Sequence, residues 1–264
     1  MSGAKDKEKI IRYFEASGSG DMARRMLDLA DQVVAGRPYR LTDFMTPAAL
    51  TVAEAIKAEY PGILVKENGG YQGAERIRIA FVDADFKGTI DWGIKPLAVT
   101  WDPRFRLLTH RDVLGSLMGL GIDREHFGDI IVREGGATVL TDASVAEFVE
   151  TQFTKIAMVS VSVAPMDLAD IKPKEECVKE VRTTVASLRL DAVASSGFSM
   201  SRTKLVSLAK AGLVQINWQP AKGPAQEVKE GDIISLRGRG RMKIEAITGT
   251  SRKGRIGVYL KRFI

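Results

Sequence analysis

The chain has 264 residues, enough for two or three small domains, and its single cysteine and two histidines exclude an internal disulfide and a zinc-ligand cluster. A content of 45% hydrophobic and 27% charged residues is typical of soluble globular proteins, and the longest mostly apolar stretch, IAMVSVSVAPM, is far shorter than the roughly 20 residues that a membrane span requires. The net charge is +6, and the lone Cys177 favours a reducing, cytosol-like compartment.

Residues 1–90 are predicted to form an N-terminal α/β domain. Apolar residues recur with a helical period over 21–36, and a second helix is expected over 46–60. Residues 62–70 and 74–83 then indicate two strands around a glycine-rich turn. This segment has neither a nucleotide-binding loop nor an acid–base constellation, so we interpret it as a packing or interaction domain.

Residues 91–165 follow the order β-α-β-β-α-β. Strands are predicted over 95–102, 128–135, 137–142 and 155–163, and helices over 109–121 and 142–153. This is the ferredoxin-like, RRM-like order that RNA-recognition domains share with many unrelated proteins. RNA-recognition modules stack bases on aromatic residues of their central strands, whereas the stretch GDIIVREG has none. If this domain meets RNA, we expect another mode of contact.

The polar residues that could suggest catalysis in these two domains have structural explanations. Thr109 and Asp112 stand at capping-box spacing, which places His110 in the first turn of a helix. Three aspartates loosely resemble a metal loop, but the oxygen-ligand spacing of an EF-hand and its closing Glu are missing, so we interpret them as a solvated turn. They are Asp83, Asp85 and Asp91. No catalytic residue, metal or cofactor is expected.

Residues 166–183 are charged and lack a clean period, so we interpret them as a linker. The C-terminal domain, 184–264, begins with helices over 187–196 and 201–211. Strands follow over 213–218 and 228–236.

The helix over 201–211 carries Arg202 and Lys204 in its first turn and no acid there. Ser199 or Ser201 can cap this end, where the helix dipole normally favours Asp or Glu. Both cations are expected on the solvent side. A first turn that tolerates positive charge indicates a site for an external anion such as phosphate.

Charge is distributed unevenly along the chain. Residues 182–264 hold 16 Lys and Arg against 5 Asp and Glu, whereas residues 1–181 hold 23 against 28. A basic C-terminal third on an acidic body indicates a polyanionic partner that is bound by one end of the protein.

The stretch RGRGRMK is a second cationic feature. In an extended chain, alternate side chains project to one side, so we expect a ladder that could contact successive phosphates. Its members are Arg237, Arg239, Arg241 and Lys243.

The C-terminal third resembles the S4 RNA-binding domain, a small αα-turn-β module. The resemblance covers some 60 residues and rests on RLD at 189–191, SRTK at 201–204, AGLVQIN at 211–217 and VKEGDII at 228–234. The whole chain resembles the YlmH-like family, whose photosynthetic branch is called photosystem II S4 domain protein. The stretch LTHRDVLGSLMGLGIDREHFGDIIV carries that resemblance in the middle domain.

We expect a non-enzymatic, monomeric protein that docks structured RNA, and the resemblance implies rRNA or tRNA on the ribosome or its large subunit. Such a protein would act in translation, ribosome maturation or quality control, and would be cytoplasmic, or stromal in a plastid. The RNA-binding residues expected from these patterns are Arg189, Ser201, Arg202, Thr203, Lys204, Ser207, Lys210, Asn217, Lys222, Arg237, Arg239, Arg241 and Lys243.

Two alternatives remain open on sequence. S4 domains often accompany RNA-modifying enzymes, and RLD at 189–191 mimics a pseudouridine synthase motif, although too few residues follow it for a synthase domain. The helices over 187–211 could also form a helix-turn-helix that binds DNA.

Overall fold

The protein is a mixed α+β chain that divides into two compact units, Met1–Lys174 and Glu175–Ile264. The computed structural model describes residues 4–15, 18–173, 178–251 and 254–263. No helix within these ranges is long and apolar enough to cross a membrane. Cys177 lies outside the described residues.

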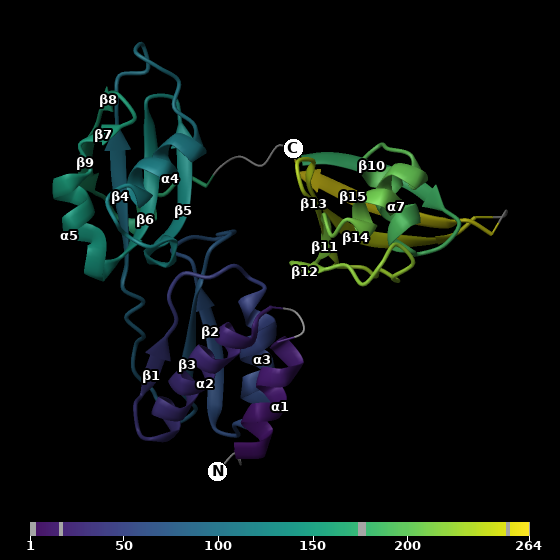
Figure 1. Ribbon diagram of the computed structural model, residues 1–264, viewed down its shortest axis with the longest axis horizontal. Coiled ribbons are helices and arrows are strands. Elements are labelled where there is room, and N and C mark those ends of the chain that lie inside the picture. Colours follow the sequence, from purple (N-terminus) through teal and green to yellow (C-terminus); the bar gives the residue numbers. More distant parts are fainter. Residues whose placement is uncertain (1–3, 16–17, 174–177, 252–253, 264) are drawn as a thin grey trace. The chain divides into compact units, whose positions relative to one another are not determined.

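The N-terminal part of the first unit packs helices on a small antiparallel sheet of order β1-β3-β2 (Figure 1). Its elements are α1 (Ala4–Glu15), α2 (Gly20–Val34), β1 (Tyr39–Leu41), α3 (Ala49–Glu59), β2 (Ile63–Asn68) and β3 (Arg78–Asp83). Ala23, Met26, Ala30 and Val33 recur at helical spacing on α2 and are buried against this core. The predicted α2, α3, β2 and β3 are confirmed, whereas α1 and β1 were not predicted.

The middle part of the first unit has the ferredoxin-like arrangement that its sequence predicts. Its elements are β4 (Ile94–Thr100), α4 (His110–Met118), η1 (Arg124–His126), β5 (Phe127–Arg133), β6 (Gly136–Asp142), α5 (Ala143–Gln152), β7 (Lys155–Ile156), β8 (Val159–Ser160), β9 (Ser162–Pro165) and η2 (Leu168–Asp170). All neighbours in the sheet β5-β6-β4-β9 are antiparallel. The single strand expected over 155–163 is wrong, because the chain turns back at Ala157, whose φ is 52°, before β9 joins the sheet.

Both faces of this middle sheet are covered by protein. Helices α4 and α5 bury Val113 and Val149 against one face. On the other face, Leu140 packs with Phe44 from the N-terminal part and with Ile171. The face that RNA-recognition modules use for base stacking is therefore occupied here by side chains of the chain itself, in agreement with the absence of aromatic residues in GDIIVREG.

Arginines also join the N-terminal and middle parts. The Arg76 guanidinium donates to the carbonyl oxygens of Phe44 and Phe127. Arg124 donates to the same Phe127 carbonyl, and burial together with the nearby Arg76 charge lowers the pKa of Arg124 to about 10. These contacts satisfy backbone oxygens where the two parts meet, so they serve the fold.

The second unit is a six-stranded antiparallel sheet of order β10-β15-β14-β13-β11-β12, packed against two helices (Figure 1). Its elements are β10 (Val178–Val185), α6 (Leu190–Gly197), α7 (Arg202–Lys210), β11 (Val214–Ile216), β12 (Gln219–Pro220), β13 (Ile233–Leu236), β14 (Gly240–Thr250) and β15 (Ile256–Phe263). Helix α6 approaches the sheet so closely that a Cβ on Gly197 would lie 2.1 Å from the Met242 sulfur.

The predicted linker, 166–183, is wrong over much of its length. Residues 168–170 form η2, and residues 178–183 belong to β10, which pairs with β15 along its whole length. Inward Val181 and Val185 alternate with outward polar residues, which explains this strand. The strand was missed because the stretch 165–183 has no period when it is considered as a whole.

Candidate nucleic-acid interface

Helices α6 and α7 differ in how much surface they expose. Helix α6 is buried over nearly its whole length, whereas α7 buries only Leu205 and Ala209. The remaining side of α7 is exposed because its apolar positions form a narrow stripe. We call this side the helical face, and its members are Thr203, Lys204, Ser207 and Lys210.

The first turn of α7 is organised by Ser201. This residue has an extended backbone, and its hydroxyl oxygen accepts a hydrogen bond from the Lys204 amide at 3.3 Å. Of the two serines that could cap the helix, Ser201 does so, while Ser199 adopts a positive φ of 53° in the turn before it. No acidic residue stands in the first turn.

The acid that balances Arg202 comes from the preceding helix. Asp191 lies in the first turn of α6 with a side chain only 6% exposed, and it accepts hydrogen bonds from Arg189 at 3.0 Å and from Arg202 at 2.9 Å. Burial alone would raise the pKa of Asp191, but the two arginines outweigh it and the pKa falls below its usual value. The sequence predicted that Arg202 points to solvent. In the structure its guanidinium is partly engaged by Asp191.

The N-terminus of α6 is closed by the chain itself. The amides of Leu190 and Asp191 donate to the carbonyls of Gln226 and Pro224, at 2.8 and 3.0 Å. The segment that carries Lys222 thus runs beside the first turn of α6, and the Lys222 side chain is exposed. The first amides of α6 are already used, so a phosphate would find free donors at α7 rather than at α6.

Asn217 has a structural role in this arrangement. With Trp218 it makes a two-residue turn between β11 and β12, where both residues have positive φ, 49° and 62°. The strand expected over 213–218 is wrong in that it ends at Ile216. The Asn217 amide donates to the buried Asp232 carboxylate and its oxygen accepts from the Ile233 amide, both at 2.9 Å. These bonds hold the turn to the start of β13.

The expected four-residue ladder is wrong as an extended segment. Arg237 and Arg239 lie in the turn between β13 and β14, with positive φ at Gly238, and the Arg237 amide donates to the carbonyl of Leu213 just after α7. Arg241 lies on β14 beyond this turn. Lys243 follows two positions later on the same strand, paired with Glu245 at 3.3 Å. Burial of the intervening Met242 against α6 puts these last two residues on the opposite side of the sheet.

Five of the predicted cations have no ion-pair partner within the part of the chain that the structure describes. They are Lys204, Lys210, Lys222, Arg237 and Arg239, and all are exposed. Lys210 ends α7, and the Arg237 backbone is bonded beside the segment that follows it. The structure thus places exposed cations on α7, on the segment beside the first turn of α6 and on the β13–β14 turn beside the end of α7.

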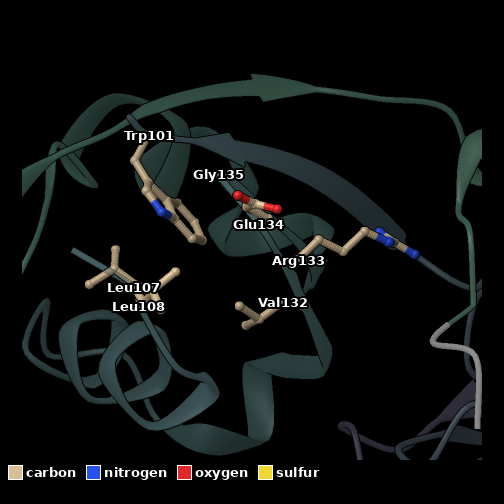
Figure 2. Close-up of a pocket in the computed structure, with 7 residues that line it drawn as sticks. All are labelled: Trp101, Leu107, Leu108, Val132, Arg133, Glu134 and Gly135. Carbon is tan, nitrogen blue, oxygen red and sulfur yellow. The ribbon is translucent and has the colours of Figure 1, made fainter. Parts of the chain in front are cut away.

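The first unit contains a cavity that the sequence did not reveal. It has a volume of about 450 Å³ and is lined by Trp101, Leu107, Leu108, Val132, Arg133, Glu134 and Gly135. In Figure 2 the Trp101 ring faces the apolar side chains, whereas the Arg133 guanidinium extends away from them. Arg133 donates to the Lys172 carbonyl, so its charge is directed to the chain after β9. The neighbouring Phe105 is 78% exposed.

The capping-box residues of α4 and the aspartates Asp83 and Asp91 have structural roles. Thr109 and Asp112 form a capping box, and α4 begins at His110, as predicted. The carboxylates of Asp83 and Asp91 accept backbone amides two residues later, which is typical of turns. Among the described residues, no group of three or more His, Cys, Asp or Glu could hold a metal ion.

Comparison with known proteins gives matches to three family models. Residues 19–86 match the family model "YlmH, N-terminal", residues 88–170 match "Putative RNA-binding domain in YlmH", and residues 188–234 match "S4 domain". A solved structure, the cell division protein ylmH from Streptococcus pneumoniae, is similar with a TM-score of 0.51 at 22% identity, over 59% of this chain and 95% of that chain.

A relative that aligns over most of both chains is more similar in sequence. The ribosome-associated protein quality control protein P2 of Bacillus subtilis (strain 168) is 35% identical over 224 residues, which cover 84% of this chain and 87% of the relative. With all three family models matched in order and most of both chains aligned, this protein belongs to the YlmH family and carries an S4 domain in its second unit.

Proposed function

We propose that this protein is a non-enzymatic RNA-binding protein that docks structured RNA, rRNA or tRNA, on the ribosome through its S4 domain. The observation that carries the proposal is the helical face. Its lysines, Lys204 and Lys210, are exposed and unpaired among the described residues, on a helix whose first turn has no acid. A helix N-terminus and nearby lysines together favour phosphate.

The neighbouring groups extend this surface in a way that suits folded RNA. Arg189 and Arg202 keep roughly half of their side chains exposed, 45% and 52%, while they share the buried Asp191. An arginine held by one carboxylate can still direct its remaining N–H groups to phosphate. Hydroxyls of Thr203 and Ser207 stand on the same helix and could bind phosphate or a ribose hydroxyl.

The ribosomal part of the proposal rests on the relative. Its name describes a ribosome-associated quality control protein, and the alignment spans most of both chains. We infer that this protein also acts at the ribosome, in translation or its quality control, and hence in the cytoplasm. In the proposed division into three domains, the first two domains determine where and when the S4 domain docks.

A binding role suits the RLD motif better than catalysis does. In a synthase-like mechanism the aspartate would have to reach a base, but Asp191 is 6% exposed and engaged by two arginines. Mapping modified bases after incubation with rRNA tests this point, and a new modification would establish an enzyme. Competition between duplex DNA and folded rRNA at fixed salt tests the helix-turn-helix alternative, which requires stronger binding of the DNA.

The proposal is tested by replacing Lys204 and Lys210 with Gln and measuring affinity for folded rRNA over a range of salt concentrations. Each lost phosphate contact should reduce the log–log salt slope by roughly 0.7–0.9. The matched control is Lys66→Gln with Lys87→Gln, two exposed lysines of the first unit that give the same change in net charge. Equal affinity and slope in the two double variants would refute a phosphate-binding helical face.

A further inference from the structure

The sheet of the second unit has one face packed against α6 and α7 and a second face that carries rings and cations. On β14 and β15 the inward residues, such as Met242 and Leu260, are buried in the core. The residues between them point the other way because side chains alternate along a strand. We call this opposite surface the sheet face, and its members are Arg182, Arg241, Lys243, Tyr259, Lys261 and Phe263, with the carboxylates Glu180 and Glu245.

The sheet face is built from three successive cross-strand pairs. Arg182 is the partner of Tyr259 and its guanidinium lies 5.2 Å from the ring centroid. Arg241 is the partner of Phe263, with the guanidinium 4.9 Å from the ring centroid. Such cation–π contacts hold the planar guanidinium groups against the rings. Each of these two outer pairs thus holds one aromatic ring and one planar guanidinium side by side.

The middle pair supplies positive charge between the rings. Lys243 faces Lys261 across the strands, and Glu245 lies 3.3 and 3.5 Å from their ammonium groups. Glu180 lies opposite Lys261 on β10, so four cations of this face stand beside two carboxylates, and both lysine side chains remain 36 to 39% exposed. The Tyr259 hydroxyl donates a hydrogen bond to Glu180, which raises the pKa of Tyr259.

We propose that the sheet face binds a single-stranded segment of RNA, with bases stacked against the Tyr259 and Phe263 rings or their arginines. Proteins that bind single strands combine stacking platforms with cations that follow the backbone. The sheet face has both, and its cations outnumber its carboxylates. Arginine planes stack on bases as well as on rings. This inference rests on the proposed RNA-binding function and extends it to unpaired RNA.

The two RNA-binding surfaces have different chemistry and lie on opposite sides of one core. The helical face offers lysines, hydroxyls and helix amides, without an aromatic ring among its members. The sheet face offers rings and guanidinium planes. Structured RNA with a double-stranded part and an unpaired flanking strand could therefore be held by both surfaces at once.

The test uses the full chain with two probes, a fluorescently labelled oligouridylate and a folded RNA hairpin. In the variant, Tyr259→Leu is combined with Phe263→Leu, which keeps apolar side chains but removes both π faces. Loss of one stacked base should weaken oligouridylate binding roughly 5- to 150-fold, and loss of a second should weaken it further. Tyr13→Leu, at an exposed tyrosine of the first unit, is the control and should bind like the original protein.

Hairpin binding separates this inference from the proposed function and reports on folding. The sheet-face variant should keep hairpin affinity, which would show that the unit is folded, while the variant at Lys204 and Lys210 should lose it. A single fluorescent aminopurine base in the oligouridylate should be quenched on binding by the original protein and much less by the sheet-face variant. Oligouridylate affinity that is undetectable in the original protein, or equal in the variant, would overturn the inference whatever the hairpin result.

Discussion

The guanidinium of Arg202, the first residue of α7, lies 2.9 Å from the carboxylate of Asp191 in the first turn of α6. This contact explains how α7 tolerates a basic first turn. The acid that favours a helix N-terminus is absent from α7 itself but is supplied across the helix pair. Since Asp191 also binds Arg189, one buried carboxylate fixes both helices and both arginines.

Arg202 and Lys204 should therefore differ in their effects on stability. Arg202→Ala removes one of two partners of a buried carboxylate and should lower the free energy of unfolding of the second unit by about 1–3 kcal/mol. Lys204→Ala should leave it nearly unchanged, because this exposed side chain has no ion-pair partner among the described residues. Urea unfolding can be followed by Trp218 fluorescence after Trp92 and Trp101 are replaced by Phe.

The same carboxylate should make the second unit sensitive to acid. The pKa of folded Asp191 is lowered, so its contribution to stability is present above its unfolded pKa of about 3.9 and is lost as the pH falls towards the folded pKa. Asp191→Asn should be less stable at neutral pH and should show a smaller loss of stability below about pH 4. Urea midpoints of both proteins across this range provide the measurement, and parallel curves would contradict it.

Much of the fold follows from local patterns in the sequence. The period of α2 and the β-α-β-β-α-β order of the middle part are local signals, and the structure agrees with both. The missed and shortened strands have non-local causes. Strand β10 has only a short local alternation at its end, and it pairs with β15 far along the chain. The ending of β11 at Ile216 depends on the bonds between Asn217 and the buried Asp232.

The candidate interface was predictable as a set of basic residues but not as a surface. Helical period shows which side of α7 is exposed, and the structure agrees. Nothing in the local pattern shows that Arg202 reaches back to Asp191, or that the RGRGR stretch turns between two strands and sends Arg241 to the opposite face. Tyr259 and Phe263 were missed because the pairing register of strands beyond the S4 motifs decides which residues share a face of the sheet.

Asn217 should contribute more to folding than to RNA affinity. Asn217→Ala removes the hydrogen bonds to Asp232 and to the Ile233 amide, and leaves a side chain that disfavours positive φ. We expect a loss of about 1–3 kcal/mol in the free energy of unfolding. Affinity for RNA measured well below the melting temperature should remain close to that of the original protein. A large loss of affinity without a loss of stability would instead make Asn217 an RNA ligand.

The second unit should carry most of the RNA affinity, provided that it is cut at the correct position. A fragment beginning at Val178 keeps β10 and its eight register pairs with β15, whereas one beginning at Ser187 exposes the core edge that Val181 and Val185 cover. The longer fragment should fold and bind folded rRNA nearly as well as the full chain, and the shorter one should aggregate. Comparable affinity in a fragment covering 1–173 would show that the S4 domain does not dominate.

The β13–β14 turn should contribute to binding through charge alone. Arg237 and Arg239 are exposed, without ion-pair partners among the described residues, and the turn is held by backbone bonds that their side chains do not make. Replacing both with Gln should therefore leave stability unchanged, weaken binding to different folded RNAs by a similar factor, and reduce the log–log salt slope by roughly 0.7–0.9 for each lost phosphate contact.

Arg104 and Arg106 in the first unit, replaced in the same way, match the change in charge. If that control pair lowered the slope equally, the effect would come from net charge and not from contact at the turn. If the Arg237 and Arg239 variant discriminated between RNA sequences, the turn would bind bases rather than phosphates.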